Sequence, residues 1–291
     1  MRSGGKGPAT LVGFTAILMW SLLALFTAAS GTVPPFQLAA MCFAVGSLVG
    51  LVWIVAGNRW RDLAQPWPVW ALGVGGLFGY HALYFTALRN APPVEAGLIA
   101  YLWPLLIVLF SALLPGERLR WFHLAGAALG LGGTALIVSR GGVAFEARYG
   151  TGYLAAFGCA LTWSAYSVLS RRFRDVPTAI VAGYCVATAL LSALAHVLFE
   201  TSVWPATSGE WLAVLALGLM PVGAAFYVWD HGVKRGDIQL LGVASYVAPL
   251  LSTLILILAG FGDFTLRIAL AALLIAGGAA LASQEMLRRS G

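Results

Sequence analysis

Apolar runs of about 20 residues follow one another along the entire chain of 291 residues. A helix of that length crosses the hydrocarbon core of a bilayer, which is roughly 30 Å thick. Charged residues make up 10% of the chain, against about 25% in soluble proteins, which excludes a soluble globular fold. The sequence predicts an all-α membrane protein with ten transmembrane helices, at residues 9–29, 34–56, 67–89, 94–114, 121–139, 150–171, 177–199, 210–233, 238–260 and 264–286.

Landmark residues recur in the same order in the two halves of the chain. Trp20-Ser21 matches Trp163-Ser164 at an offset of 143 positions, and Tyr101 matches Tyr246 at an offset of 145. An ordered repeat of this kind indicates an internal duplication, which is common among membrane transporters. We therefore expect two five-helix units, at residues 1–143 and 144–291. Further matched pairs are Val33-Pro34 with Val176-Pro177, Cys42 with Cys185, Pro104 with Pro249, and Gly132-Gly133 with Gly277-Gly278.

Basic residues are distributed unevenly between the two sides of the membrane. Of the 17 lysines and arginines, 13 fall on the side that holds the N-terminus and 4 on the other. Short loops rich in basic residues face the cytoplasm, so both termini are expected to be cytoplasmic. Because each unit has an odd number of spans, the second must enter from the opposite face, which predicts inverted repeats. The larger group is Arg2, Lys6, Arg59, Arg61, Arg118, Arg120, Arg171, Arg172, Arg174, Lys234, Arg235, Arg288 and Arg289; the smaller is Arg89, Arg140, Arg148 and Arg267.

Polar-tipped aromatic residues gather in the third and fourth expected spans, which the short segment 90–93 joins. They lie at similar depths in the membrane and need polar partners or water there. An intramembrane histidine is a candidate functional residue. Two interpretations stay open: these side chains line a substrate site, or a histidine–tyrosine hydrogen bond pins two helices together. The residues are Tyr80, His81, Tyr84, Tyr101 and Trp103.

The remaining site candidates lie near the middle of other spans. A proline inside a span removes a backbone hydrogen bond, so Pro104 and Pro249 are expected kinks or hinges at equivalent points of the two halves. Asp230 is either part of a charged cluster that reaches the membrane surface or a proton-coupling carboxylate. With no carboxylate at the midplane, the sequence favours transport of a solute down its own gradient without an obligatory ion. The other candidates are Trp20, Trp163, Tyr166, Ser245 and Tyr246.

Signatures of enzymes and metal sites are lacking in the sequence. The three cysteines lie inside expected spans and lack metal-ligand spacing. A remote alternative to a transporter is an intramembrane transferase enzyme. Such an enzyme would need an aspartate-rich metal motif or a catalytic pair at membrane depth, and the sequence shows neither. Small residues spaced four apart, Gly75 with Gly79 and Gly126 with Gly130, are expected to allow close helix packing. We expect no cofactor, no metal, no nucleic-acid partner and a monomer in the lipid bilayer.

These landmarks together resemble the EamA branch of the drug/metabolite transporter superfamily, over essentially the whole chain. The resemblance rests on Trp20-Ser21 and Trp163-Ser164, the prolines after Tyr101 and Tyr246, Gly116-Glu117 and the late glycine pairs. The aromatic third and fourth spans with His81 most resemble the YddG-type amino-acid exporters of that branch.

This resemblance implies a secondary transporter of the bacterial inner membrane. It would export aromatic and other neutral amino acids, methionine among them, by alternating access around a cavity between spans 1, 3, 4, 6, 8 and 9. Phe226 stands where the second half would repeat His81, and Gly262-Asp263 replaces Gly116-Glu117, so the pocket is expected to be asymmetric. Export of drugs or other small metabolites is the alternative.

Overall fold

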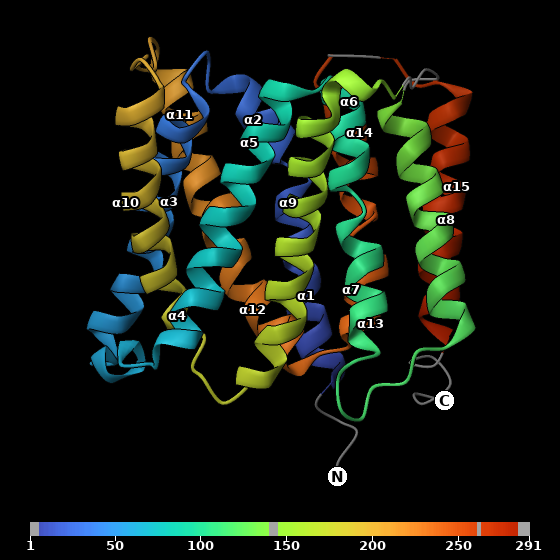
Figure 1. The fold of residues 1–291 in the computed structure, drawn as a ribbon, viewed down its shortest axis with the longest axis horizontal. Helices are drawn as coiled ribbons and strands as arrows, with labels where there is room; N and C mark the ends of the chain where they lie inside the picture. The colour runs from blue at the N-terminus through green and yellow to red at the C-terminus, as the bar shows by residue number, and fades with distance from the viewer. Residues whose placement is uncertain (1–5, 140–144, 261–262, 285–291) are drawn as a thin grey trace.

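A computed structural model describes residues 6–139, 145–260 and 263–284. All regular secondary structure in these ranges is helical, and the helices stand side by side across the full height of the molecule (Figure 1). The all-α prediction is therefore confirmed for the described part of the chain. Several residues named above lie outside it: Arg2, Arg140, Gly262, Arg288, Arg289 and the expected boundary at 143–144.

The helices of each half follow the expected spans closely. The first half holds α1 (Lys6–Trp20), α2 (Leu23–Ala29), α3 (Pro35–Ala56), α4 (Trp67–Val74), α5 (Tyr80–Asn90), α6 (Pro93–Ala100), α7 (Trp103–Ser111) and α8 (Trp121–Val138). The second holds α9 (Gly150–Leu169), α10 (Ile180–Phe199), α11 (Ser208–Leu219), α12 (Ala225–Arg235), α13 (Ile238–Ala244), α14 (Val247–Leu258) and α15 (Leu266–Ala282). Short 3₁₀ turns lie at Trp60–Leu63, Ala147–Tyr149 and Ser170–Phe173.

Eight helical stretches among the described residues are long and apolar enough to cross a membrane. Two further helices occupy the sixth and tenth expected positions: α9 with 20 residues and α15 with 17. Both run beside the others in Figure 1. The chain is therefore a multi-pass helical protein, while the count of ten and the inversion of the halves stay predictions.

Prolines and threonines set where several helices begin. Pro35 and Pro93 stand in the first turns of α3 and α6, where the missing amide hydrogen would have no partner within the helix. Thr207 and Thr265 accept hydrogen bonds from the backbone amides of Glu210 and Ile268 at the starts of α11 and α15.

Five spans are interrupted, and four of the interruptions match between the halves. The fourth span breaks between α6 and α7 just before Pro104, and the ninth breaks between α13 and α14 just before Pro249. The third and eighth spans each contain a π-helical turn, at Gly75–Gly79 and Met220–Ala224, 145 positions apart. The first span breaks between α1 and α2. Since π-helical turns are frequent at functional sites, the matched turns direct attention to these spans.

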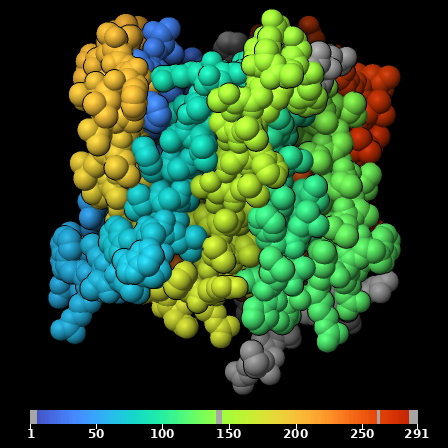
Figure 2. Space-filling view, in the orientation of Figure 1, coloured from blue at the N-terminus to red at the C-terminus, as the bar shows by residue number. Residues whose placement is uncertain are grey.

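The two halves interleave instead of forming separate lobes (Figure 2). The helix pairs α3–α10, α8–α15, α1–α12 and α5–α9 each join the first half to the second. Glycines allow the closest approach, since a Cβ on Gly278 would lie 2.5 Å from the carbonyl oxygen of Gly126. Close packing is therefore confirmed for Gly126 and Gly278. The prediction of close packing is wrong for Gly75, where an added Cβ would meet nothing within 4 Å.

Ion pairs mark the two ends of the bundle. At one end, which we call the Glu117 end, the Glu117 carboxylate lies 3.1 Å from the Lys6 ammonium and 3.0 Å from the Arg171 guanidinium. At the opposite Glu200 end, the Glu200 carboxylate lies 2.8 Å from the Arg89 guanidinium. Segments expected on the cytoplasmic side thus meet one another at the Glu117 end.

Candidate functional site

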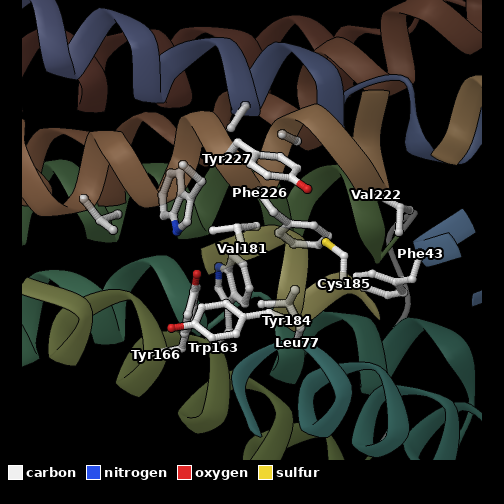
Figure 3. Packing of buried hydrophobic residues seen from close by; sticks show 14 of the residues in the cluster. Phe43, Leu77, Trp163, Tyr166, Val181, Tyr184, Cys185, Val222, Phe226 and Tyr227 are labelled. Carbon is white, nitrogen blue, oxygen red and sulfur yellow. The ribbon is translucent and has the colours of Figure 1, made fainter. Parts of the chain in front are cut away.

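Four tryptophans from four helices meet in the core of the bundle. The Trp20 ring of α1 lies 5.0 Å from Trp229, 5.7 Å from Trp163 and 6.2 Å from Trp103, measured between ring centroids. Trp103, Trp163 and Trp229 are buried, whereas Trp20 is half-buried. Figure 3 shows part of this core, where Trp163 projects from α9 toward Phe226 of α12. We call this group the tryptophan cluster.

A second set of aromatic rings adjoins the tryptophan cluster and remains half-buried. Tyr80 lies 5.6 Å from Trp163 and stacks in parallel on Tyr84 at 6.1 Å. Tyr101, at the break of the fourth span, lies within electrostatic range of both tyrosines. These hydroxyl-bearing rings keep some accessible surface beside the buried tryptophan cluster; we call them the wall and the tryptophan cluster its apolar floor.

His81 belongs to this wall, and its hydrogen bond defines its tautomer. Its Nδ1 lies 2.7 Å from the Leu77 carbonyl oxygen, inside the π-helical turn Gly75–Gly79. A carbonyl only accepts hydrogen bonds, so Nδ1 carries the hydrogen and Nε2 is left for another partner. The ring also makes edge contacts with Phe43 at 5.0 Å and Tyr80 at 5.3 Å. His81 therefore presents one acceptor nitrogen beside the tyrosine wall.

The indole and serine groups near the tryptophan cluster bond to backbone and side-chain oxygens. Trp20 Nε1 donates to the Pro221 carbonyl oxygen at 3.1 Å, inside the second π-helical turn. Trp229 Nε1 donates to Ser167 Oγ at 3.1 Å. Ser164 Oγ donates to the Ala160 carbonyl oxygen of its own helix and lies 3.3 Å from the Trp103 carbonyl oxygen. The tryptophan cluster is thus tied to both halves of the chain.

Ser245 and Tyr246 lie in a different environment from the wall. Tyr246 is fully buried in a second packed group with α8 and α15, and a Cβ on Gly130 would lie 2.4 Å from its ring. Its hydroxyl accepts a hydrogen bond from the Leu105 amide at 3.2 Å. Ser245 Oγ donates to the Leu241 carbonyl of its own helix at 2.7 Å. The Tyr246 bond satisfies an amide that the break before Pro104 leaves without a helical partner.

Asp230 forms a buried ion pair in α12. The Lys234 ammonium lies 2.9 Å from Asp230 Oδ2, and only 1% of the Asp230 side chain is exposed. Thr178 Oγ1 also donates to Asp230 Oδ2, at 2.8 Å. Asp230 and Lys234 are therefore buried, whereas His231 and Arg235 of the same charged cluster are half-buried and exposed.

Trp229, Phe226 and Phe43 were missed when candidates were chosen from the sequence. Phe226 stacks on Phe43 at 5.6 Å, and Trp229 lies at the centre of the tryptophan cluster. A signal was present, because Trp229 stands 145 positions after Tyr84, as Phe226 does after His81. Applying the repeat offset to each wall residue would have found both.

The arrangement can hold a small molecule by ring stacking and hydrogen bonding. Among the described residues, no group of histidine, cysteine, aspartate and glutamate side chains could hold a metal ion. Aromatic pairs contribute about 0.5–1.5 kcal/mol each beyond their buried area, and tyrosine rings attract cations. These groups suit a solute that combines an apolar ring with charged ends.

Comparison with known proteins identifies the family. A model of the EamA-like transporter family matches residues 7–139 and again residues 150–284. The chain belongs to this family. It is 60% identical to the aromatic amino acid exporter YddG of Ancylobacter novellus, over 96% of this chain and 98% of the relative. A crystal structure with 60% identity has a TM-score of 0.92, covering 96% of this chain and 98% of the other.

More distant relatives are also exporters. The aromatic amino acid exporter YddG of Escherichia coli is 24% identical, over 84% of this chain and 86% of the relative. The pseudopaline exporter CntI of Pseudomonas aeruginosa is 28% identical, over 82% and 81%. The family and these relatives are transporters, so the prediction of a transporter is confirmed and the alternative of an intramembrane transferase is excluded.

Proposed function

We propose that this protein exports aromatic amino acids, and other neutral ones such as methionine, across the bacterial inner membrane by alternating access. The observation that carries the proposal is the tryptophan cluster with its half-buried wall of Tyr80, His81, Tyr84 and Tyr101. Two relatives that are aromatic amino acid exporters support the same substrate class.

The wall and the tryptophan cluster supply partners for the ring and the ammonium group of an aromatic amino acid. The substrate ring would stack on Trp163 and Trp20, and its ammonium would lie against the tyrosine faces. His81 Nε2, left free of the Leu77 bond, would accept a hydrogen bond from the ammonium. Truncating one true contact should weaken transport roughly 5–100-fold, because an unpaired buried polar group costs about 1–3 kcal/mol.

The proposed architecture is ten spans in two inverted five-helix repeats, residues 1–143 and 144–291, with both termini in the cytoplasm. Support comes from the family model matching twice, the matched interruptions and the 13-to-4 split of basic residues. The breaks before Pro104 and Pro249 would act as hinges when one group of helices rocks against the other.

Uptake into liposomes tests the function. Purified protein should take up labelled tryptophan, phenylalanine and methionine down their gradients, without a pH or sodium gradient. Transport of drugs or non-amino-acid metabolites in place of amino acids would favour the alternative. Accumulation above equilibrium under a pH gradient would instead show proton coupling, with Asp230 and His81 as the groups to examine.

Cysteine labelling tests the topology. Single cysteines at Arg59 and Arg172, in a background lacking the three native cysteines, should be shielded from impermeant thiol reagents in intact cells. The native cysteines are all buried in apolar surroundings, so their removal is tolerable. Labelling of either position from outside would overturn the N-in orientation.

A further inference from the structure

The Asp230–Lys234 pair forms a complete binding site for an ammonium group. The Lys234 ammonium lies 2.9 Å from Asp230 Oδ2 and donates to the Val176 carbonyl oxygen at 3.2 Å. The Lys234 side chain is only 5% exposed. A carboxylate and a carbonyl oxygen at these distances are the acceptors that an amino-acid ammonium requires. The ammonium group of an amino acid could therefore occupy the position that the Lys234 ammonium occupies in this structure.

This site is continuous with the tryptophan cluster. Asp230 follows Trp229 directly in α12, and the Trp229 ring stacks against Trp163 at 6.3 Å. The Tyr166 ring also lies 5.2 Å from Trp163. The rings of Trp229 and Tyr166 thus both adjoin Trp163, on which an aromatic side chain would stack.

Tyr166 adds an unused polar atom at the same place. Its side chain is 1% exposed, and its hydroxyl has no hydrogen-bond partner among the residues that the structure describes. The Asp230 carboxylate lies within electrostatic range of this hydroxyl. A buried hydroxyl without a partner is costly, so the position suits a ligand that brings an acceptor, such as a carboxylate.

The corresponding ion pair at the Glu200 end is built differently. Arg89 stands at the position equivalent to Lys234, but its partner Glu200 lies just beyond the end of α10, so that pair joins two spans. Asp230 and Lys234 are four residues apart in one helix. Val176 and Thr178, in the segment before α10, are the other bonding partners of the pair. When the pair opens, the long lysine stem can carry its charge toward the Glu117 end.

We propose that Asp230, with the Tyr166 hydroxyl, forms a second substrate subsite toward the Glu117 end, which takes the ammonium and carboxylate of an aromatic amino acid. Lys234 fills the ammonium position when no substrate is bound. The subsite rests on the proposed function, since it needs an amino acid as the transported solute. It places the substrate between the tryptophan cluster and the expected cytoplasmic side.

Two substitutions within the pair should act in opposite directions. Tryptophan uptake is measured in inside-out membrane vesicles. Asp230→Asn should raise the KM for tryptophan about 10-fold or more, because the ammonium loses its anion. Lys234→Gln should lower the KM several-fold, because the competing ammonium is gone. Lys6→Gln, which alters an exposed ion pair at the same end, is the matched control and should leave the KM unchanged.

Inhibitors separate the two charged ends of the substrate. Tryptamine keeps the ammonium and lacks the carboxylate, whereas indole-3-propionate keeps the carboxylate and lacks the ammonium. Asp230→Asn should weaken inhibition by tryptamine about 10-fold and leave inhibition by indole-3-propionate unchanged. Tyr166→Phe should do the reverse and weaken only the second inhibitor.

The outcomes are distinct. A purely structural pair would lower the melting temperature in both variants and leave the KM of any folded variant unmoved, which overturns the subsite. If Asp230→Asn left the KM unchanged but abolished accumulation above equilibrium under a pH gradient, Asp230 would act in proton transfer. That result would also overturn the subsite. If Asp230→Asn fails to fold, Lys234→Gln decides alone, and a KM that is equal or higher rejects the proposal. Absence of uptake by the wild-type protein would reject the proposed function together with the subsite.

Discussion

In the first half of the chain α4 and α5 join through a π-helical turn at Gly75–Gly79, and in the second half α11 and α12 join through one at Met220–Ala224. The side chains that follow the two turns differ. The first half presents His81 and Tyr84, whereas the second presents Phe226 and Trp229 at the same offset. One span supplies the half-buried polar wall and the other supplies part of the buried apolar floor. The two halves thus share the backbone irregularity, while the side chains that follow it differ in their surroundings.

The ends of the same two spans diverge in a second way. Arg89 is 46% exposed and reaches Glu200 beyond the end of α10, whereas Lys234 is 5% exposed, pairs with Asp230 of its own helix and donates to the Val176 carbonyl oxygen. Glu200 also accepts the backbone amides of Phe36 and Gln37 and lies 3.0 Å from His196 Nδ1. The Glu200 end is therefore held by a multi-partner network, while the Asp230 pair makes fewer connections.

The largest expected effect tests that contrast. Glu200→Ala removes a carboxylate that is 3% exposed and leaves its several partners unsatisfied. Breaking a buried charged network costs about 3–5 kcal/mol, so the melting temperature in detergent should fall sharply. Glu146→Ala is the matched control, because the Glu146–Arg148 pair is exposed and should contribute about 1 kcal/mol or less. Equal melting temperatures for the two variants would contradict the role assigned to the Glu200 network.

The second prediction exchanges the diverged side chains. His81→Phe installs the residue that the second half carries at the equivalent position, so the fold should tolerate it. Transport of tryptophan should fall roughly 5–100-fold, because Nε2 is lost and the Leu77 carbonyl loses its partner. Phe226→Leu, a change without polar consequences, should reduce transport less than about 5-fold. A parallel loss of expression and transport in His81→Phe would instead identify His81 as a structural pin.

Much of the fold could be predicted because bilayer thickness and the repeat constrain it strongly. Apolar run length predicted the spans, and the tyrosine–proline pairs predicted where the fourth and ninth spans break. The π-helical turns escaped prediction, since Gly75–Gly79 reads as an ordinary helix-packing motif in an apolar segment. A π-helical turn depends on tertiary contacts, here the packing of Gly76 against Tyr166 and of Gly223 against Gly46.

The candidate site could be predicted only in part. The sequence indicates His81 and the tyrosines as candidates because polar atoms at membrane depth need hydrogen-bond partners or water. Trp229 did not, since an apolar ring in an apolar span carries no such signal. Tyr246 is a candidate because it lies near the middle of its span, yet the structure packs its ring beside Gly130. Which of two equivalent aromatic residues faces the core centre depends on helix rotation, which the repeat offset does not encode.

The third prediction concerns the link between the tryptophan cluster and the second π-helical turn. Trp20→Phe keeps an aromatic ring and removes the donor to the Pro221 carbonyl. One hydrogen bond contributes about 0.5–1.5 kcal/mol, so transport should fall roughly 2–10-fold. Trp121→Phe, at a position that is 70% exposed, is the control and should transport normally. Wild-type transport by Trp20→Phe would show that the bond to Pro221 has no part in transport.

The smallest expected effect falls where the two halves should behave alike. Gly132 in α8 and Gly277 in α15 are equivalent positions, and a Cβ on either would meet nothing within 4 Å. Gly132→Ala and Gly277→Ala should therefore each change the stability by no more than about 0.5 kcal/mol, with melting temperatures close to wild type. Their neighbours provide the contrast, since a Cβ on Gly133 would lie 2.7 Å from Ile275 Cγ1 and one on Gly278 would lie 2.5 Å from the Gly126 carbonyl oxygen. Gly133→Ala and Gly278→Ala should each cost about 1–3 kcal/mol by overpacking. If Gly132→Ala destabilised the protein as much as Gly133→Ala, the α8–α15 contact would involve a different helix face from the one described.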